Sequence, residues 1–461
     1  MALTNSKKSK TAKLASGAPQ GAKAAGKSLR DRVSRGSQAE LKLRPRRDPL
    51  AILQKSDESR LQELVPIRYG RMLASPFAFF RGSAAIMADD LSHTHSTGII
   101  VQACGDCHLK NFGGFATPER NIVFDINDFD ETLPAPWEWD LKRLATSFVM
   151  ATRANGISAT AGREVTMTCV ESYRKGMHAF SKLDPLGVWY SRVHAEDFLA
   201  LLTGPDRQRV ERRVTKATAK RGSDVDYPKL AEVVNGKTHI REVPPLIYHP
   251  EVARSSDFES QVLEVLKAYR ETLTDDRRVL FDRYTFVDAA IKVVGIGSVG
   301  TRCWIALFMS HANEPLFLQF KQANASVLES YAGKSAYAHH GQRIVAGQRL
   351  VQAASDIFLG WTTGPNADFY VRQLRDAKIS PILETFDEGI FLAYARACGW
   401  NLARAHAKSG DAWMLDGYIG KSDALAQAIA TFAEKYADLA ERDHAELAAA
   451  VKSGKIQVFV E

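Results

Sequence analysis

The spacing of apolar positions predicts helices toward both ends of the chain. Apolar residues recur three and four positions apart, which is the periodicity of a helix with one buried face. This pattern is found over 48–73, 138–182, 257–284 and 388–451. Two short apolar runs, at 97–104 and 120–128, lie within the first helical region and predict strands.

Between residues 285 and 380 the pattern changes to short apolar runs separated by glycine and polar turns, which predicts antiparallel strands. The polar, proline-containing segment 203–250 is interpreted as a connector or insertion. Helices and strands are segregated along the chain, which indicates an α+β protein and not an alternating parallel-sheet one. We expect a helical lobe over 48–284, a strand-rich lobe over 285–380, and C-terminal helices over 381–461 that complete the helical lobe.

The composition is that of a globular protein, with 45% hydrophobic and 25% charged residues in a chain of 461. The net charge of +8 suggests nucleic acid as a partner. However, residues 1–47 contain thirteen basic and two acidic residues, a net of +11, so the rest of the chain carries −3. This segment is nearly free of large apolar residues, so burial cannot offset its ordering entropy, and we expect a disordered basic tail.

Three roles stay open for this tail. It is a transit peptide, a weak electrostatic tether to nucleic acid or acidic lipid, or simply a solvated segment, which we favour. It has no apolar stretch of the kind found in secretory signals, and no run of about 18 apolar residues predicts a membrane span. Five scattered cysteines indicate a reducing compartment, so we expect a cytoplasmic protein.

Residues 104–108, Cys-Gly-Asp-Cys-His, fit several chemistries. C-x-x-C-H is the attachment motif of covalent haem, and C-x-x-C is also a redox pair. The chain shows neither an export signal, which haem attachment normally requires, nor a thioredoxin-like context. A turn-rich loop whose polar residues satisfy backbone groups is a third alternative.

We favour a fourth interpretation, a site of phosphoryl transfer. That reaction requires a carboxylate to take the hydroxyl proton and oxygen ligands that hold magnesium on the phosphates. Asp106 is followed by Asn111 and then by Asp125, which ends an apolar strand. Asp128 and Asp130 follow on the same strand end and are further candidates for the metal.

The segment GDCHLKN followed by VFD resembles the G-D-x-H-x-x-N and I-D motifs of aminoglycoside and choline kinases, members of the protein-kinase-like superfamily. The resemblance implies that Asp106 is the catalytic base. It further implies that Asn111 and Asp125 bind magnesium, with Asp128 as an additional candidate. In the same way it assigns His108 the role of shaping the loop.

The resemblance continues past the motif. The stretch PWEWDLKRLA resembles the helix start that braces the catalytic loop in these kinases, with Asp140 in the bracing position. The sequence departs from the family at Ala103 and Cys104, where many relatives have a histidine before the Gly-Asp pair.

Gly295, Gly297 and Gly300 form a G-x-G-x-x-G pattern. A dinucleotide fingerprint requires a helix directly after the glycines, but an apolar, strand-like run follows them here. A glycine turn between two strands is the arrangement that covers nucleotide phosphates in kinases. A third strand carries Lys321, which we interpret as contacting the phosphates and not as reaching solvent.

A partner carboxylate for Lys321 is harder to identify. Kinases place a glutamate on the helix after the lysine, but the predicted helix at 341–355 contains none. Glu329 lies eight residues after Lys321 and is our candidate for this position, with Gln348 as a weaker substitute.

The order of these motifs is unusual, because in ordinary kinases the glycine loop precedes the catalytic loop. Here it follows by about 190 residues, which implies a circular permutation if both motifs are genuine. Permutation is tolerated when the broken joint lies at the surface. Residues 398–411 resemble the helix that leads into the catalytic loop of small-molecule kinases, which supports this interpretation.

The combined pattern over residues 45–450, including an unassigned Phe-Arg-Gly at 80–82, resembles a bacterial family known only as domain of unknown function 2252. We therefore expect a bilobal, permuted kinase-like fold that binds ATP and Mg²⁺. The expected reaction transfers phosphate to the hydroxyl of an unidentified acceptor, with a small molecule favoured. Transfer of the nucleotide moiety and a silent nucleotide-binding or scaffold role are the alternatives.

Overall fold

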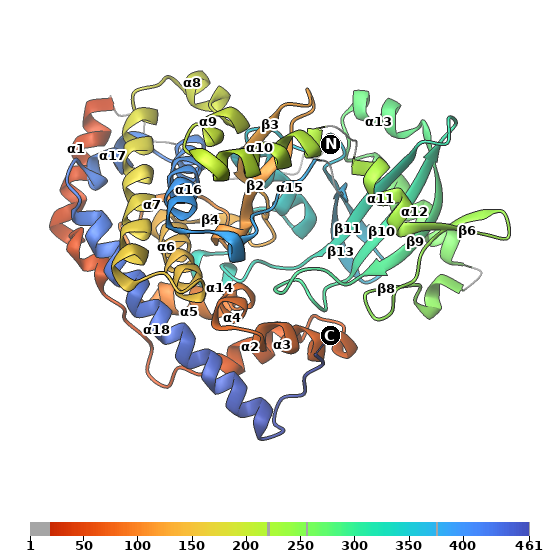
Figure 1. The fold of residues 1–461 in the computed structure, drawn as a ribbon, viewed down its shortest axis with the longest axis horizontal. Helices are drawn as coiled ribbons and strands as arrows, with labels where there is room; N and C mark the ends of the chain where they lie inside the picture. Colours follow the sequence, from red (N-terminus) through yellow and green to blue (C-terminus); the bar gives the residue numbers. More distant parts are fainter. Residues whose placement is uncertain (1–18, 219–221, 255–256, 375–376, 461) are drawn as a thin grey trace, which may run out of the picture.

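The computed structural model describes residues 19–218, 222–254, 257–374 and 377–460. The chain forms a helical lobe and a lobe built on a sheet, which lie side by side (Figure 1). This arrangement confirms the expected α+β class. Within the described residues, none of the helices is both long and apolar enough to cross a membrane.

Long helices that pack together form the core of the helical lobe. They are α6 (Trp137–Ala154), α7 (Ala159–Phe180), α16 (Glu388–Ser409) and α18 (Ala424–Lys452). Helices α7 and α16 approach closely because small residues lie where they cross. A Cβ atom on Gly399 would lie 2.1 Å from the carbonyl oxygen of Cys169, so only glycine fits there.

The other lobe is a six-stranded antiparallel sheet with the order β12-β13-β11-β10-β9-β8. Its strands are β8 (Ile247–Tyr248), β9 (Tyr284–Lys292), β10 (Cys303–Ser310), β11 (Pro315–Ala323), β12 (Gly360–Gly364) and β13 (Ala367–Gln373). Alternation along β11 places Leu318 and Phe320 in the apolar core under helix α12 (Phe258–Arg270). The opposite face of the sheet carries Gln319 and Lys321.

Two short strand pairs in the helical lobe position the acidic loops. Strand β1 (Ile100–Ala103) pairs with β4 (Leu133–Pro136), and β2 (Phe112–Ala116) forms a hairpin with β3 (Ile122–Ile126). The segments 104–111 and 127–132 connect these two pairs. Both loops therefore leave the same small group of strands.

The strand-rich lobe begins earlier in the sequence than residue 285. Strand β8 forms the edge of the sheet, and α12 packs against β12, so both belong to this lobe. The predicted connector 203–250 contains helix α10 (Gly204–Thr218) and the hairpin β6 (Ala231–Val234) and β7 (Lys237–Ile240). The predicted boundary at residue 285 was therefore wrong. The helical periodicity of α12 did not indicate which lobe its apolar face would cover.

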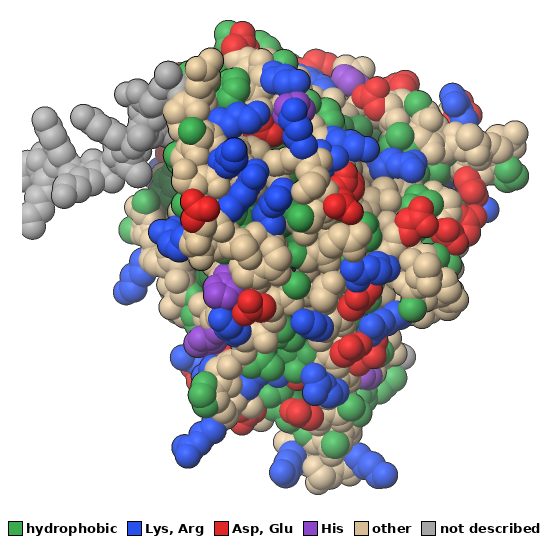
Figure 2. All heavy atoms as spheres, turned by 90° about the vertical axis from the view of Figure 1, so that its left-hand side faces the viewer, with side chains coloured by type: hydrophobic (Ala, Val, Ile, Leu, Met, Phe, Trp, Pro, Cys, Tyr) green, Lys and Arg blue, Asp and Glu red, His purple; other side chains and the backbone are tan. Residues whose placement is uncertain are grey.

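The prediction of a disordered tail over 1–47 was also wrong for residues 19–47; the rest of that segment lies outside the described residues. Helix α1 (Pro19–Arg32) packs against α17 (Ala412–Ile419). Arg30 donates to the carbonyl oxygens of Gly417 and Tyr418 at 2.5 and 2.9 Å. Figure 2 looks onto this side of the molecule and shows a group of Lys and Arg side chains on its upper part. Basic side chains thus dock the segment by donating to carbonyl groups, which an apolar count does not detect.

Arg47 anchors the end of this segment in the body. Its guanidinium forms paired hydrogen bonds with Asp90 at 2.6 and 2.8 Å and with Asp443 at 2.7 and 2.6 Å. Burial raises the pKa of Asp443, which the Arg47 guanidinium opposes. The three side chains form a buried ionic triad in which one cation serves two carboxylates.

We expect Arg47→Met to lower the free energy of unfolding by about 3–5 kcal/mol, because it leaves two buried carboxylates without their cation. Urea unfolding at pH 7 measures this. Lys42→Met is the control, since Lys42 forms an exposed ion pair with Glu40 whose loss costs about 1 kcal/mol or less. Equal effects of the two substitutions would show that the segment is not anchored by Arg47.

Candidate active site between the lobes

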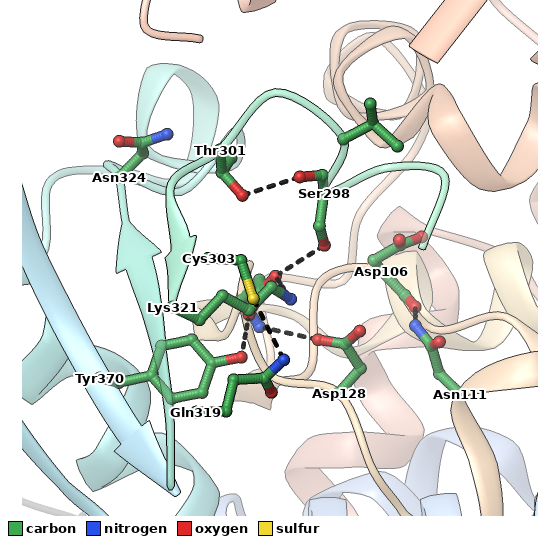
Figure 3. A network of polar contacts seen from close by, with 12 residues as sticks. Asp106, Asn111, Asp128, Ser298, Thr301, Cys303, Gln319, Lys321, Asn324 and Tyr370 are labelled. Carbon is green, nitrogen blue, oxygen red and sulfur yellow. Dashed lines mark hydrogen bonds and ion pairs between the residues drawn. The ribbon is translucent and has the colours of Figure 1, made fainter. Parts of the chain in front are cut away.

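A pocket lies between the glycine-containing turn that joins β9 to β10 and the two acidic loops of the helical lobe. Figure 3 shows Ser298 reaching from that turn over Asp106 and Asp128. The lining includes charged, polar and glycine residues from six separate segments: Arg60, Arg81, Asp106, His108, Asn111, Asp128, Asp130, Glu131, Gly295, Gly297, Ser298 and Asn324. The structure therefore brings most of the predicted site residues to one place.

The loop that carries Asp106 is held from below by Asp140. The two carboxylate oxygens of Asp140 accept hydrogen bonds from the backbone N–H groups of Cys104 and Gly105 at 2.7 and 3.0 Å. Gly105 has φ +84°, and a Cβ atom there would lie 2.3 Å from the carbonyl oxygen of Glu131. The side chain of Asn111 closes the loop by donating to the Asp106 carbonyl at 2.8 Å.

Asp106 presents one carboxylate oxygen to the protein. Oδ1 accepts a hydrogen bond from Arg143 Nε at 2.5 Å, whereas Oδ2 lies 3.7 Å from Nε2 of His108. Burial raises the pKa of Asp106, while Arg143 opposes the rise. Burial lowers the pKa of His108 well below its ordinary value, so its imidazole is neutral. The second oxygen of Asp106 remains available to accept a proton.

Asp130 forms an ionic contact with Lys321 across the two lobes. The same carboxylate accepts a hydrogen bond from the Tyr370 hydroxyl at 2.8 Å and lies 3.4 Å from Ser298 Oγ. Although burial alone would raise it, Lys321 holds the pKa of Asp130 below its usual range. Burial and the neighbouring Asp130 charge raise the pKa of Asp128. Asp130 is thus neutralised by Lys321, whereas Asp128 forms no ion pair with any of the described residues.

The expectation that Asp125 binds magnesium is not supported by its position. Its carboxylate is fully buried, with both oxygens on Arg404 Nη2 at 2.6 and 2.7 Å. It also accepts hydrogen bonds from the backbone N–H groups of Ile126 and Ala353 at 2.8 and 2.7 Å. The pocket lining includes Asp128 but not Asp125. Of the predicted magnesium ligands, Asn111 and Asp128 line this pocket.

The three glycines divide between two tasks. Gly295 and Gly297 line the pocket, and Gly295 has φ +71°. Gly300, with φ +86°, faces away: its carbonyl oxygen accepts a hydrogen bond from the N–H of Leu61 at 2.7 Å. A Cβ atom on Gly300 would lie 3.0 Å from the Cβ atom of Arg60, so glycine allows the turn to pack against this segment.

Glu329 does not serve as the partner of Lys321. Its carboxylate accepts a hydrogen bond from the N–H of Ser326 at 3.2 Å and lies 3.9 Å from Arg343 Nε. Helix α15 (His340–Val351) supplies Arg343, which donates to the carbonyl oxygen of Asp130 at 2.8 Å. Helix α15 therefore holds the acidic turn. Asp130 of this turn, and not a glutamate on or near the helix, is the carboxylate that pairs with Lys321.

Cys104 and Cys107 are buried residues of the loop that carries Asp106. Cys104 and Cys107 are 2% and 0% exposed, and burial raises the pKa of both thiols. Their sulfur atoms and a carboxylate oxygen of Asp140 lie within 4.8 Å of one another. Because both thiols are buried, neither is accessible to a haem or to a thiol of another molecule, and Asp140 already holds the loop backbone.

Two functional arginines were missed at the sequence level. Arg143 pairs with Asp106, and Arg404 pairs with Asp125. Both are buried on long helices, Arg143 on α6 and Arg404 on α16. A charged residue on the buried face of such a helix was the available signal.

The family described as "Uncharacterized protein conserved in bacteria (DUF2252)" matches residues 60–450. This range includes both acidic loops, the glycine turn and the helices α6, α7 and α16. No curated protein and no solved structure matches the chain.

We expect Asp125→Asn and Asp128→Asn to have opposite effects on stability. Asp125→Asn leaves the buried Arg404 without its counter-charge and should cost about 3–5 kcal/mol of unfolding free energy. Asp128→Asn removes a carboxylate whose pKa is raised in the folded state, so at pH 7 it should leave stability unchanged or increase it.

Urea unfolding of both variants, measured between pH 4 and pH 8 in steps of about one pH unit, checks these effects on stability. Any gain from Asp128→Asn should shrink as the pH falls through the folded-state pKa of Asp128, because the wild-type carboxyl then becomes neutral. A large loss of stability for Asp128→Asn would contradict the assignment of Asp128 to the pocket.

Proposed function

We propose that this chain, which belongs to the DUF2252 family of uncharacterised bacterial proteins, is an ATP- and Mg²⁺-dependent phosphotransferase. The observation that carries the proposal is the shared pocket of two sequence segments about 190 residues apart. One segment contributes the Asp106 loop and the acidic turn at Asp128. The other contributes the glycine turn and the strand with Lys321. These are the parts that phosphoryl transfer requires.

The local order of elements supports the same assignment. The Asp106 loop is followed by the β2–β3 hairpin and then by the acidic turn, in which Asp128 precedes the buried Phe129. Protein kinases place a magnesium-binding aspartate directly before a packed phenylalanine. Asp128 has this position, whereas Asp125 does not.

The proposal includes a circular permutation of a kinase-like fold. The C-terminal helix α16 packs on α7 and reaches the catalytic segment without being joined to it in the chain. At its end, Ser409 Oγ accepts a hydrogen bond from the N–H of Gln102 at 3.0 Å, just before the Asp106 loop. Arg404 on the same helix pairs with Asp125 at 2.6 Å. These contacts substitute for the covalent joint that an unpermuted chain would have.

In the proposed reaction, the oxygen of an acceptor hydroxyl forms a bond to the γ-phosphorus of ATP as the bond from that phosphorus to the ADP oxygen breaks. The hydroxyl proton passes to Oδ2 of Asp106, the oxygen not bonded to Arg143. Asn111 and Asp128 would hold the magnesium ion, which neutralises phosphate charge. The backbone N–H groups of the glycine turn, which lines the pocket, would bind the remaining phosphate oxygens, and so would the ammonium of Lys321, which contacts the pocket residue Asp130.

Lys321 is buried and charged at the same time. It is 3% exposed, and Asp130 and Tyr370 raise its pKa against the effect of burial. The charged ammonium is therefore held beside Asp130, which lines the pocket. Phosphate oxygens would join or replace Asp130 as its counter-charge.

The experiment uses purified protein with Mg²⁺, a bacterial metabolite extract, and ATP labelled separately on the α- and γ-phosphates. We expect label to move from the γ position. Asp106→Asn and Lys321→Met should each reduce transfer by about 100-fold or more, because one removes the proton acceptor and the other a phosphate contact. The controls Asp438→Asn and Lys42→Met alter exposed ion pairs and should retain activity.

The other outcomes separate the alternatives. Movement of α-label would indicate nucleotidyl transfer on the same site, and ATP binding without turnover would indicate a silent nucleotide-binding protein. Absence of Mg²⁺-dependent ATP binding would contradict the kinase-like assignment altogether.

A further inference from the structure

The Phe80-Arg81-Gly82 segment, which the sequence left without a role, ends helix α4 (Pro76–Gly82) at the edge of the pocket. Its backbone is held on both sides of Arg81. The carbonyl of Phe80 accepts a hydrogen bond from Arg143 Nη2 at 3.0 Å, and the carbonyl of Gly82 accepts one from Arg68 Nη2 at 2.9 Å. The position of Arg81 is thus fixed by two buried arginines.

Arg143 and the glycine turn connect Arg81 to the site. Arg143 is the residue that pairs with Asp106, so one side chain orients the proposed base and the backbone before Arg81. The glycine turn lies against the same backbone: a Cβ atom on Gly297 would lie 3.3 Å from the carbonyl oxygen of Arg81. Arg81 therefore lies between the glycine turn and the catalytic loop.

The side chain of Arg81 lines the pocket without a partner. Its Nε is buried and has no hydrogen-bond acceptor among the described residues. None of the described carboxylates pairs with its guanidinium, although the charges of Asp106, Glu384 and Asp128 act on it from farther away. A buried donor without an acceptor is costly, which indicates a position completed by a ligand.

Arg60, another arginine that lines the pocket, has a structural task. Arg60 donates to the carbonyl oxygens of Val299 and Ser56 at 2.5 and 3.2 Å, and its Nε lies 3.2 Å from Asp57. It fastens the glycine turn to the N-terminal helices. Arg81 has no such acceptor in the described parts of the chain, so its guanidinium is available to an anion.

We propose that Arg81 binds the γ-phosphate of ATP and stabilises the phosphoryl group during its transfer, as a further catalytic residue of the function proposed above. The guanidinium lies among the charges of Asp106 and Asp128, where that function places the reacting phosphorus. The carboxylates there would repel a phosphoryl group, and a fixed cation offsets this repulsion. In phosphoryl transfer an arginine at the equatorial oxygens contributes about 10³–10⁵ in rate.

Binding of two nucleotides tests this role without knowledge of the acceptor. Titration calorimetry compares the Mg²⁺ complexes of ADP and of a non-hydrolysable ATP analogue. We expect Arg81→Gln to weaken the ATP analogue at least about 10-fold while ADP changes less than about two-fold, because only the analogue has a γ-phosphate. Arg81→Lys should retain part of the difference, and γ-label transfer by Arg81→Gln should fall by about 10³.

The control is Arg153→Gln, which removes an arginine from exposed ion pairs on α6 and should change neither nucleotide. Thermal unfolding of Arg81→Gln should match that of the control, since no bond of the Arg81 side chain within the described residues is lost. If this variant is unstable, Arg81→Lys decides, because it retains charge but not the guanidinium geometry.

Equal weakening of both nucleotides, or of neither, would overturn the role of Arg81. If the wild type binds both nucleotides and Lys321→Met weakens them while Arg81→Gln does not, only this inference fails. If the wild type binds neither nucleotide, the proposed function fails and the role of Arg81 with it.

Discussion

The ionic contact between Lys321 and Asp130 fixes the relation of the two lobes. Lys321 comes from the sheet and is almost fully buried, so its charge is tolerable only beside a carboxylate. Asp130 belongs to a turn of the helical lobe, and Arg343 holds the backbone of that turn through its carbonyl groups. Tyr370 adds a hydrogen bond to the same carboxylate. The width and the chemistry of the cleft depend on this group.

A second ionic pair joins two segments of the helical lobe that are far apart in the sequence. Arg404 and Asp125 are 279 residues apart, and both are inaccessible to solvent. Separating Arg404 from Asp125 would leave an unpaired buried charge. Helix α16 therefore stays packed on β3, although the two elements are far apart in the chain. Asp140 acts in the same way at shorter range, because it holds the backbone of the loop that carries Asp106. Asp125 and Asp140 thus both have structural tasks in the helical lobe.

The sequence predicted the site's neighbourhood better than its individual contacts. Motif spacing identified the loops of Asp106 and of the glycines, because backbone turns are encoded locally. It did not separate Asp125 from Asp128, since every residue of β3 is buried and alternation gives no direction there. The partner of Lys321 was likewise hidden, because Asp130 lies 191 residues before it. The docked basic segment was missed because arginine-to-carbonyl contacts leave no apolar pattern.

Arg81 and Asp128 are incompletely neutralised in opposite senses, and this links the two proposals. One is a cation with a buried nitrogen that lacks an acceptor, and the other is a carboxylate whose pKa burial and a like charge raise. An ion pair between Arg81 and Asp128 would have neutralised both charges, yet none joins the two side chains. A bound magnesium phosphate would satisfy both, since the metal would take the carboxylate and the phosphate the guanidinium. Ionisable groups that burial and like charges perturb in one pocket are typical of a functional site.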